Sequence, residues 1–221
     1  AGYRVRVAVR RPHLAGDVRL AGAPGWVDIV QANVRHKGSV EAAIQDADAV
    51  VNLVGLLYEK GAQSFEAAQR DGAINVAEAC AKAGIKRLVH VSAIGADAGA
   101  KADYAETKGE AEAAIRETLP EATILRPSIV FGPEDDFFNR FAAMARVAPV
   151  LPLIGGGHTK FELVYVGDVA AALVRAVEGE LEAGSTWELG GPEILTFKEC
   201  MDRMLETIGR RRAFANLPFG I

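Results

Sequence analysis

Two apolar runs, DAVVNLVG (residues 48–55) and KRLVHVS (residues 86–92), together with the pattern between them decide the fold class. Each run is short and rich in β-branched residues, which is typical of a strand in a buried parallel sheet. Between the runs, apolar and small residues recur at helical spacing, at Phe65, Ala68, Gly72, Val76, Ala79 and Ala83. Gly84 follows as a helix stop signal. The stretch therefore predicts strand, crossover helix and parallel strand.

The same alternation extends in both directions along the chain. Further strand patterns are RVRVAV (4–9), WVDIVQA (26–32), ATILRPSIV (122–130) and STWELGG (185–191). A second crossover helix is predicted over residues 103–119, with Asp103 as its N-cap and Pro120 after its end. Asp168, after Gly167, is interpreted as the N-cap of a later helix. The chain is thus an α/β protein with a parallel sheet.

Composition excludes several classes of protein. The 221 residues are 50% hydrophobic, which suffices for one substantial core or a core plus a small lobe. The net charge is −4 and charges of both signs are interspersed, so we expect no nucleic-acid partner. No apolar run approaches the ~18 residues of a membrane-spanning helix. Cys80 and Cys200 lack metal or redox spacing, so we expect small buried hydrophobes, a reducing compartment and no metal.

Polar and small residues follow every predicted strand. In an open parallel sheet, ligands bind outside the carboxyl ends of the strands, so these residues are candidates for one cleft. They are Arg10 and Arg11 after the first strand, Asn33 and Val34 after the second, Asn52 to Gly55 after the third, Ser92 after the fourth, and Arg126, Pro127 and Ser128 at the fifth.

Five motifs in this order carry a family resemblance: DAVVNLVG, AGIKRLVHVSAIGA (83–96), YAETK (104–108), LRPSIVFGPED (125–135) and VYVGDVA (164–170). The chain resembles the extended and atypical short-chain dehydrogenase/reductase superfamily. RPSIVFGPEDDFFNRFA (126–142) points to the branch that contains the nucleotide-binding accessory subunit of respiratory complex I. The resemblance implies a Rossmann-type, doubly wound parallel sheet in residues 1–130. Residues 131–221 would form a smaller substrate or partner lobe, interleaved with the last strand of the sheet.

One part of the superfamily pattern is missing. Members begin with a strand, a Gly-x-x-Gly-x-x-Gly turn and a helix that bind the cofactor pyrophosphate. The glycine run Gly155 to Gly157 comes late and precedes no helical pattern, so we interpret it as a loop. We therefore expect the sheet to lack its first βα unit, which is roughly 30 residues. Relatives also usually continue beyond the last residues seen here.

The resemblance gives the candidate dinucleotide contacts. Arg10, supported by Arg11, stands where an arginine pairs with the 2′-phosphate of NADP(H), and no acidic residue lies between Val9 and Gly16. This favours NADP(H) over NAD(H); the alternative is a solvated arginine pair. Asn33 and Val34 would lie beside adenine.

Further contacts are expected closer to the nicotinamide. Asn52, Leu53, Val54 and Gly55 would border the cofactor ribose, with Gly55 permitting close approach. Arg126 and Pro127 would shape the nicotinamide side of the cleft, as in relatives, and Ser128 is a further candidate cofactor contact.

Tyr104 and Lys108 form the Tyr-x-x-x-Lys pair of the superfamily, on one face of a helix. In active members the lysine also binds the nicotinamide ribose and favours the tyrosinate, which exchanges a proton with substrate. Ser92 is the candidate third catalytic residue, although relatives often place this hydroxyl later, near Ala93. His90, in the fourth strand, is interpreted as a packed residue and not a base.

Two functions of different class remain open. In the first, the chain is a dinucleotide-binding accessory or assembly subunit of complex I, with little or no turnover, that contacts complex I or another protein through its second lobe. In the second, it is an active NADP-dependent reductase, epimerase or dehydratase that acts on a small carbonyl or nucleotide-sugar substrate. We expect a cytoplasmic protein, or one at the inner face of an energy-transducing membrane, on the matrix side in mitochondria. That location allows peripheral membrane association.

Overall fold

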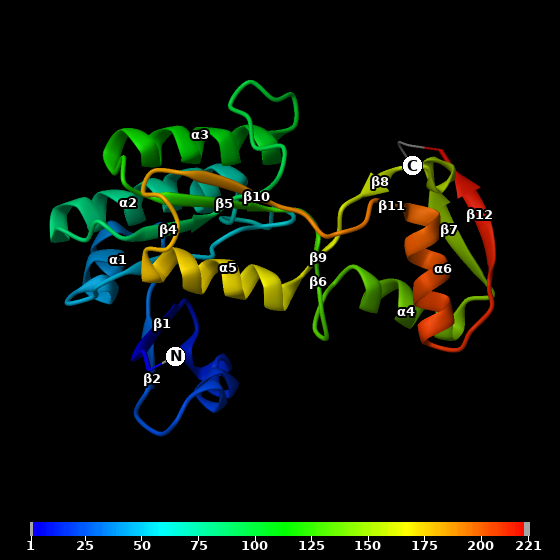
Figure 1. The fold of residues 1–221 in the computed structure, drawn as a ribbon, viewed down its shortest axis with the longest axis horizontal. Coiled ribbons are helices and arrows are strands. Elements are labelled where there is room, and N and C mark those ends of the chain that lie inside the picture. Colours follow the sequence, from blue (N-terminus) through cyan, green and yellow to red (C-terminus); the bar gives the residue numbers. More distant parts are fainter. Residues whose placement is uncertain (1, 219–221) are drawn as a thin grey trace. The chain divides into compact units, whose positions relative to one another are not determined.

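The computed structural model describes residues 2–218, and the chain divides into two compact units. The first unit comprises residues 1–125 and 175–187, and the second comprises residues 126–174 and 188–221 (Figure 1). The chain thus leaves the first unit after residue 125, returns to it once for residues 175–187, and then re-enters the second unit. The division of labour between a dinucleotide-binding domain (1–130) and a substrate or partner lobe (131–221) stays a prediction.

A four-stranded sheet with the order β10-β5-β4-β3 forms the centre of the first unit. Its strands are β3 (Val50–Asn52), β4 (Leu88–Val91), β5 (Thr123–Pro127) and β10 (Thr186–Leu189). β3 and β4 are parallel, with Asn52 opposite His90, and β4 and β5 are also parallel. The parallel strands expected from the two apolar runs at residues 48–55 and 86–92 are confirmed.

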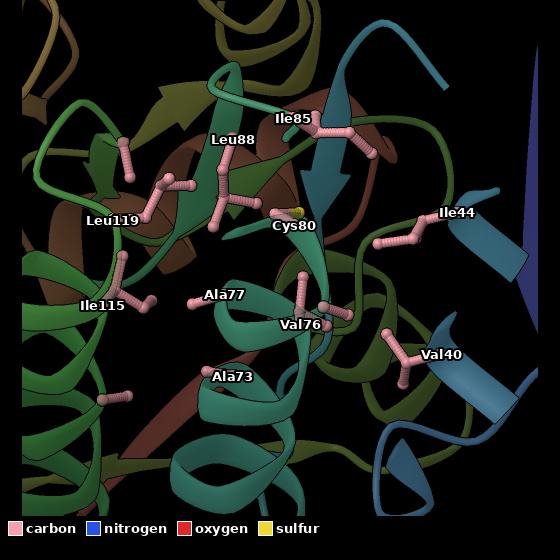
Figure 2. Packing of buried hydrophobic residues seen from close by; sticks show 13 residues of the cluster. Val40, Ile44, Ala73, Val76, Ala77, Cys80, Ile85, Leu88, Ile115 and Leu119 are labelled. Atoms are coloured by element: carbon pink, nitrogen blue, oxygen red, sulfur yellow. The ribbon is translucent and has the colours of Figure 1, made fainter. Parts of the chain in front are cut away.

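Three helices pack together in this unit: α1 (Lys37–Ile44), α2 (Asp71–Ala83) and α3 (Asp103–Thr118). Figure 2 shows α2 between its neighbours, with Val40 and Ile44 on one side and Ile115 on the other. The α2 face toward these residues carries small side chains, such as Ala77, which permit close helix packing. α2 ends where Gly84 takes the left-handed conformation (φ 72°), which confirms the predicted stop.

The N-terminal strands form a separate parallel pair, β1 (Val5–Val9) with β2 (Val27–Gln31) (Figure 1). Two 3₁₀ turns, Pro12–Leu14 and Gly16–Ala21, connect them. The Arg6 guanidinium donates hydrogen bonds to the carbonyl oxygens of Ala43 (2.9 Å) and Gln45 (2.6 Å), at the C-terminal end of α1. A cation is favourable at this end of the helix dipole, so Arg6 joins the strand pair to α1.

The second unit has its own core, which is rich in aromatic residues. Its elements are β6 (Val130–Phe131), α4 (Phe138–Val147), β7 (Val150–Ile154), a 3₁₀ turn (Gly155–Gly157), β8 (Lys160–Phe161), β9 (Val164–Tyr165), β11 (Leu195–Thr196), α6 (Phe197–Thr207) and β12 (Ala213–Leu217). The helix α5 (Val166–Glu178) begins in this unit and ends in the first. Phe137, Phe141 and Phe197 meet edge to face at centroid distances of 5.3–6.2 Å. Cys200 is buried in this core and Cys80 in the first, as expected.

Two predicted helix caps are wrong. The N-cap of α3 is Ala102, and Asp103 is the first helical residue without a side-chain capping bond. α5 begins at Val166, so Asp168 lies inside its first turn. Both carboxylates still lie near a helix N-terminus, where the helix dipole favours negative charge. The sequence signal marked the first turn but not the residue that begins it.

We expect the 221-residue chain on its own to self-associate. Within residues 2–218, β1 pairs only with β2, and β3 pairs only with β4, so each leaves an edge unpaired. Val5 and Val51, on these strands, are exposed. Exposed apolar strand edges are templates for pairing with other chains, and charge on the edge opposes it. Light scattering should therefore show larger species for the wild type than for Val51→Lys.

The control for this prediction is Leu20→Lys, which adds the same charge at an exposed apolar residue outside any strand. A wild-type chain that stays monomeric at high concentration, or an equal effect of both substitutions, would contradict it.

Candidate functional site

Lys108 is the centre of a buried polar cluster in the first unit. Its side chain projects from α3, is 3% exposed, and donates from Nζ to the Val91 carbonyl oxygen at the end of β4 (3.2 Å). The next residue is Gly109, where a Cβ atom would come within 2.2 Å of the Ala98 backbone nitrogen. Only glycine therefore lets the loop after β4 pass this closely against α3. This contact holds Lys108 beside the carboxyl end of the sheet.

Burial dominates the electrostatics of Lys108. Loss of solvation lowers the pKa of its ammonium group to about 8, and the Glu112 carboxylate, one turn later on α3, opposes this shift. Glu112 is itself buried. At neutral pH the Lys108 ammonium is therefore still charged, but it loses its proton more readily than the ammonium of an exposed lysine.

His90 and Asn52 form the second part of the cluster, on neighbouring strands. The Asn52 Oδ1 atom accepts a hydrogen bond from the Val54 backbone nitrogen (3.1 Å), so its amide nitrogen faces His90 Nδ1 (3.2 Å). Nδ1 thus accepts, and the ring proton lies on Nε2. Desolvation, and then the nearby charge of Lys108, lower the pKa of His90 to about 3. His90, 1% exposed, is a neutral packed residue, as expected.

Two buried polar atoms of this cluster have no partner within residues 2–218: His90 Nε2 and Ser92 Oγ. Buried polar atoms are almost always hydrogen-bonded in folded proteins, so such atoms at strand ends indicate a place for a ligand oxygen or water. Gly55 leaves room in the same region, since a Cβ there would lie 3.5 Å from Lys108 Nζ. These features fit the ribose of a dinucleotide, which offers hydroxyl groups to donors and acceptors alike.

Tyr104 lies one turn before Lys108 but is not coupled to it. Its ring packs edge to face on Phe65, with centroids 5.7 Å apart. Its hydroxyl makes no hydrogen bond to any residue in 2–218, including Lys108 and Ser92. Burial raises the pKa of Tyr104 above its usual value of 10. The predicted residues are thus brought into one region, but the hydroxyls of Tyr104 and Ser92 and the ammonium of Lys108 are not bonded to one another.

Gln69 is a site residue that the sequence pattern did not reveal. It is buried in a π-helical turn, Glu66–Arg70, immediately before α2. Its Oε1 accepts from the Leu56 backbone nitrogen (3.2 Å), and its Nε2 donates to Thr107 Oγ1 (3.3 Å). Gln69 therefore joins the loop after β3 to the helix of Tyr104 and Lys108. π turns are frequent at functional sites, but the apolar periodicity of residues 65–83 gives no sign of one.

The residues proposed for the adenosine half of the cofactor lie on loops after β1 and β2. Arg10 and Arg11 are exposed, and their side chains make no ion pair or hydrogen bond within the described chain. Asn33 Oδ1 accepts from the Arg35 backbone nitrogen (3.2 Å), and the Val34 carbonyl accepts from Asn75 Nδ2 (2.8 Å). The loop is thus rigidly held, and its Asn33 oxygen is already engaged.

The remaining predicted contacts divide between the units. Leu53 and Val54 follow β3 in the first unit. Pro127 ends β5, and Ser128 follows it, so both belong to the second unit. Their contact with a cofactor stays a prediction.

Comparison with known proteins gives a consistent result. A family model described as NAD(P)H-binding matches residues 1–179. The mitochondrial NADH dehydrogenase (ubiquinone) 1 alpha subcomplex subunit 9 of Arabidopsis thaliana is 38% identical over 92% of this chain and 51% of its own. The mitochondrial NADH-ubiquinone oxidoreductase 40 kDa subunit of Neurospora crassa is 31% identical over 98% of this chain and 57% of its own. The chain thus spans about half the length of these relatives.

A solved structure, the UDP-glucuronic acid 4-epimerase of Bacillus cereus in complex with UDP-glucuronic acid and NAD, superposes with a TM-score of 0.82. The sequences are 19% identical, and the match covers 98% of this chain and 78% of the epimerase, which establishes the shared fold. Sequence and structure agree with the expected short-chain dehydrogenase/reductase architecture and with homology to the complex I subunits. The chain belongs to the NAD(P)H-binding family.

Proposed function

We propose that the chain is the dinucleotide-binding part of an accessory or assembly subunit of respiratory complex I, and that it binds the nucleotide with little or no turnover. The observation that carries this proposal is the buried cluster of Lys108, His90 and Ser92, in which His90 Nε2 and Ser92 Oγ have no partner within residues 2–218 and the Tyr104 hydroxyl is not bonded to Lys108. Homology to two subunits of NADH–ubiquinone oxidoreductase supports the assignment to complex I.

The low turnover follows from the state of Tyr104. A tyrosine that exchanges a proton with substrate near neutral pH needs a cation close enough to lower its pKa. Here burial raises the pKa of Tyr104, and Lys108 donates to the Val91 carbonyl. Tyr104 therefore stays a neutral hydroxyl, which binds an oxygen atom but is a poor base.

The cofactor that we propose is NADP(H), in preference to NAD(H). Arg10 and Arg11 follow β1 with free guanidinium groups, and an arginine binds a phosphate through two parallel hydrogen bonds. When bound, the nicotinamide would supply hydride chemistry. In this proposal Lys108 and Ser92 hold its ribose, and Asn33 and Val34 lie beside the adenine.

The proposed partner is complex I, contacted through the second unit, on the matrix side of the inner membrane. The named relatives are mitochondrial. Within residues 2–218, no helix combines the length and the apolar character that crossing a membrane requires.

The alternative function is an active reductase, epimerase or dehydratase on a small carbonyl or nucleotide sugar. The unpartnered Ser92 Oγ favours it, because a substrate oxygen could accept from that hydroxyl. Activity would then require the Lys108 ammonium, which the first proposal also places on the ribose, to approach the Tyr104 hydroxyl and lower its pKa.

Turnover is tested in the native full-length protein with NADPH and a panel of carbonyl and nucleotide-sugar substrates. We expect rates no higher than those of Tyr104→Phe, because the tyrosine is not activated. NADPH absorbance measures reduction, and chromatography of the sugar products measures epimerisation or dehydration, because those two reactions return the cofactor to its starting state. An NADPH-dependent rate on a physiological substrate that Tyr104→Phe abolishes would establish the alternative function instead.

Cofactor preference is tested by calorimetric titration with NADPH and NADH. Arg10→Ala should weaken NADPH binding by about 1.5–3 kcal/mol, the usual contribution of a hydrogen bond to a charged group, and leave NADH binding nearly unchanged. Arg11→Ala should weaken NADPH binding by less than Arg10→Ala does, because successive side chains at a strand end point to opposite sides. The preference for NADPH should shrink as salt rises.

Arg4→Ala is the matched control, since it removes the same charge from an exposed arginine just before β1. Equal losses for NADH and NADPH in Arg10→Ala would show that the arginine supports its loop and does not bind the phosphate.

The role of Lys108 predicts a pH dependence of NADH binding. The pKa of Lys108 is lowered to about 8, so its ammonium form, which donates to the ribose, is lost as the pH rises above 8. NADH affinity should therefore fall between pH 7.5 and about 9.5 as that donor disappears. Lys108→Met should bind more weakly, with an affinity that stays constant over this range.

Lys101→Met, at an exposed lysine in the loop before α3, should keep the wild-type pH profile. If Lys108→Met shows the same fall in affinity as the wild type, the ammonium group of Lys108 does not bind the cofactor.

A further inference from the structure

The parallel strands β7 and β12 of the second unit are apolar on both faces. Leu151 and Leu153 of β7 are buried in the core of this unit, and Phe214, opposite Leu151, packs against the same core. Side chains alternate between the two faces along a strand, so the remaining register pairs point to the opposite face. We call this the outer face; its pairs are Val150 with Ala213, Pro152 with Ala215, and Ile154 with Leu217.

The outer face is largely exposed, although its composition is that of a buried surface. Five of its six side chains are exposed, and Val150, Ile154 and Leu217 are so by 41%, 46% and 36%. Figure 1 shows α6 beside this strand pair, and Met201 of α6 belongs to the core on the other face. Parallel strands with an unbroken apolar run, such as VLPLI in β7, are typical of sheets covered on both faces. The outer face therefore indicates a second covering element.

Unpaired arginine side chains lie at one end of the outer face. Arg210 and Arg211 shortly precede β12, and Arg146 shortly precedes β7. Parallel strands begin at the same edge of a sheet, and there the Ala213 backbone nitrogen donates to the Pro149 carbonyl oxygen (3.3 Å). None of the three arginine side chains makes an ion pair or hydrogen bond to any residue in 2–218. This end of the face thus carries three unpaired cations.

The nearby carboxylates do not balance these cations. Arg210 and Arg211 line a cavity of about 490 Å³ together with Asp202 and Glu206 of α6. Asp202 already pairs with Lys198 (2.7 Å). Of the two carboxylates that line the cavity, this leaves Glu206 for two guanidinium groups. The surplus of positive charge favours an acidic partner.

The size of the outer face matches one short helix. Five residues in a strand span about 16 Å, which a helix covers with about 11 residues. Helices are also the usual cover of parallel strands. Two such strands offer roughly 160 Å², far below the ~800 Å² per partner of a stable protein–protein interface, which argues against a second copy of this chain.

We propose that the outer face, together with Arg146, Arg210 and Arg211, binds an acidic amphipathic helix of another complex I subunit. The inference rests on the proposed function, because it names the surface of the second unit through which complex I is contacted. The helix places apolar residues at three- and four-residue spacing on the strands, and carboxylates beside the arginines.

The first experiment identifies the occupant of the outer face. The photoreactive residue p-benzoylphenylalanine replaces Ala215, in the middle of β12, in the native full-length protein within cells that contain complex I. After irradiation, mass spectrometry should identify a peptide of another complex I subunit with apolar residues at helical spacing and with Asp or Glu. The control position is Ala143, exposed on α4, which should not yield this peptide.

Every other result of the cross-linking would overturn the proposal. These results are a cross-link to lipid, to a second copy, to another segment of the same polypeptide or to a subunit segment without acidic residues, and also the absence of any cross-link.

The second experiment tests the arginines and leaves the outer face unchanged. Surface plasmon resonance measures how the native full-length protein binds complex I from a strain that lacks it. Arg210→Gln combined with Arg211→Gln should weaken binding by about twofold to thirtyfold, the range for two exposed ion pairs. Rising salt should weaken wild-type binding more than binding of this variant.

Arg4→Gln combined with Arg19→Gln is the matched control, since it removes two exposed arginines from the first unit, and it should bind as the wild type. Circular dichroism checks that both double variants are folded. Equal affinities of the two double variants for complex I would contradict the proposal.

NADPH binding, measured on the same samples, separates this inference from the proposed function. Weaker binding to complex I with unchanged NADPH affinity in the Arg210 and Arg211 variant sustains the inference. Wild-type binding to complex I that the substitutions do not affect rejects the inference alone. A wild type with no affinity for complex I rejects both this inference and the proposed assignment to complex I, whatever its NADPH affinity.

Discussion

The burial of one ammonium group governs the geometry of the first unit. Moving a charged group out of water costs several kcal/mol unless it is paired and hydrogen-bonded. Lys108 has the Val91 carbonyl as an acceptor and the Glu112 carboxylate as a neighbouring charge. Glu112 lies one turn later on the same helix, whereas the bond to Val91 requires α3 to lie against the end of β4, and the close approach at Gly109 provides that position. The pKa of His90 is lowered first by its own burial and then by the charge of this ammonium. The same ammonium lies beside Gly55, where a Cβ atom would be 3.5 Å from Nζ.

The sequence was sufficient to predict the alternation of strands and helices, because the spacing of apolar residues and the content of β-branched residues indicate local structure and burial. It also placed Tyr104 and Lys108 on one helix face, since four-residue spacing fixes that geometry. It did not indicate the π turn that directs Gln69 toward Leu56 and Thr107, because such a turn depends on tertiary contacts. Nor did it distinguish Asp103 from Ala102 as the cap of α3, since helix ends are the least certain part of any pattern.

The two loops at the adenosine end of the candidate site differ in how they are held. The loop after β2 is fixed by Asn75, and a Cβ at Gly72 would come within 2.7 Å of the Val34 side chain, so this loop lies directly on α2. Arg10 and Arg11, after β1, have no such restraint within the described chain. In the proposed function, a well-held surface for adenine beside exposed cations would let shape select the base and charge add affinity for a phosphate.

The balance of donors and acceptors at the strand ends supports the proposal that the site binds a nucleotide without proton transfer by Tyr104. His90 Nε2, the Lys108 ammonium and the Tyr104 hydroxyl are donors, whereas the one basic nitrogen of His90 is taken by Asn52. Burial holds the pKa of His90 to about 3 and raises the pKa of Tyr104, so these two side chains are neutral at physiological pH. A cluster in this state offers hydrogen bonds to ligand oxygens, such as ribose hydroxyls or a carbonyl. In the proposed function this cation stabilises the backbone of β4 instead of a tyrosinate, so Tyr104 stays protonated.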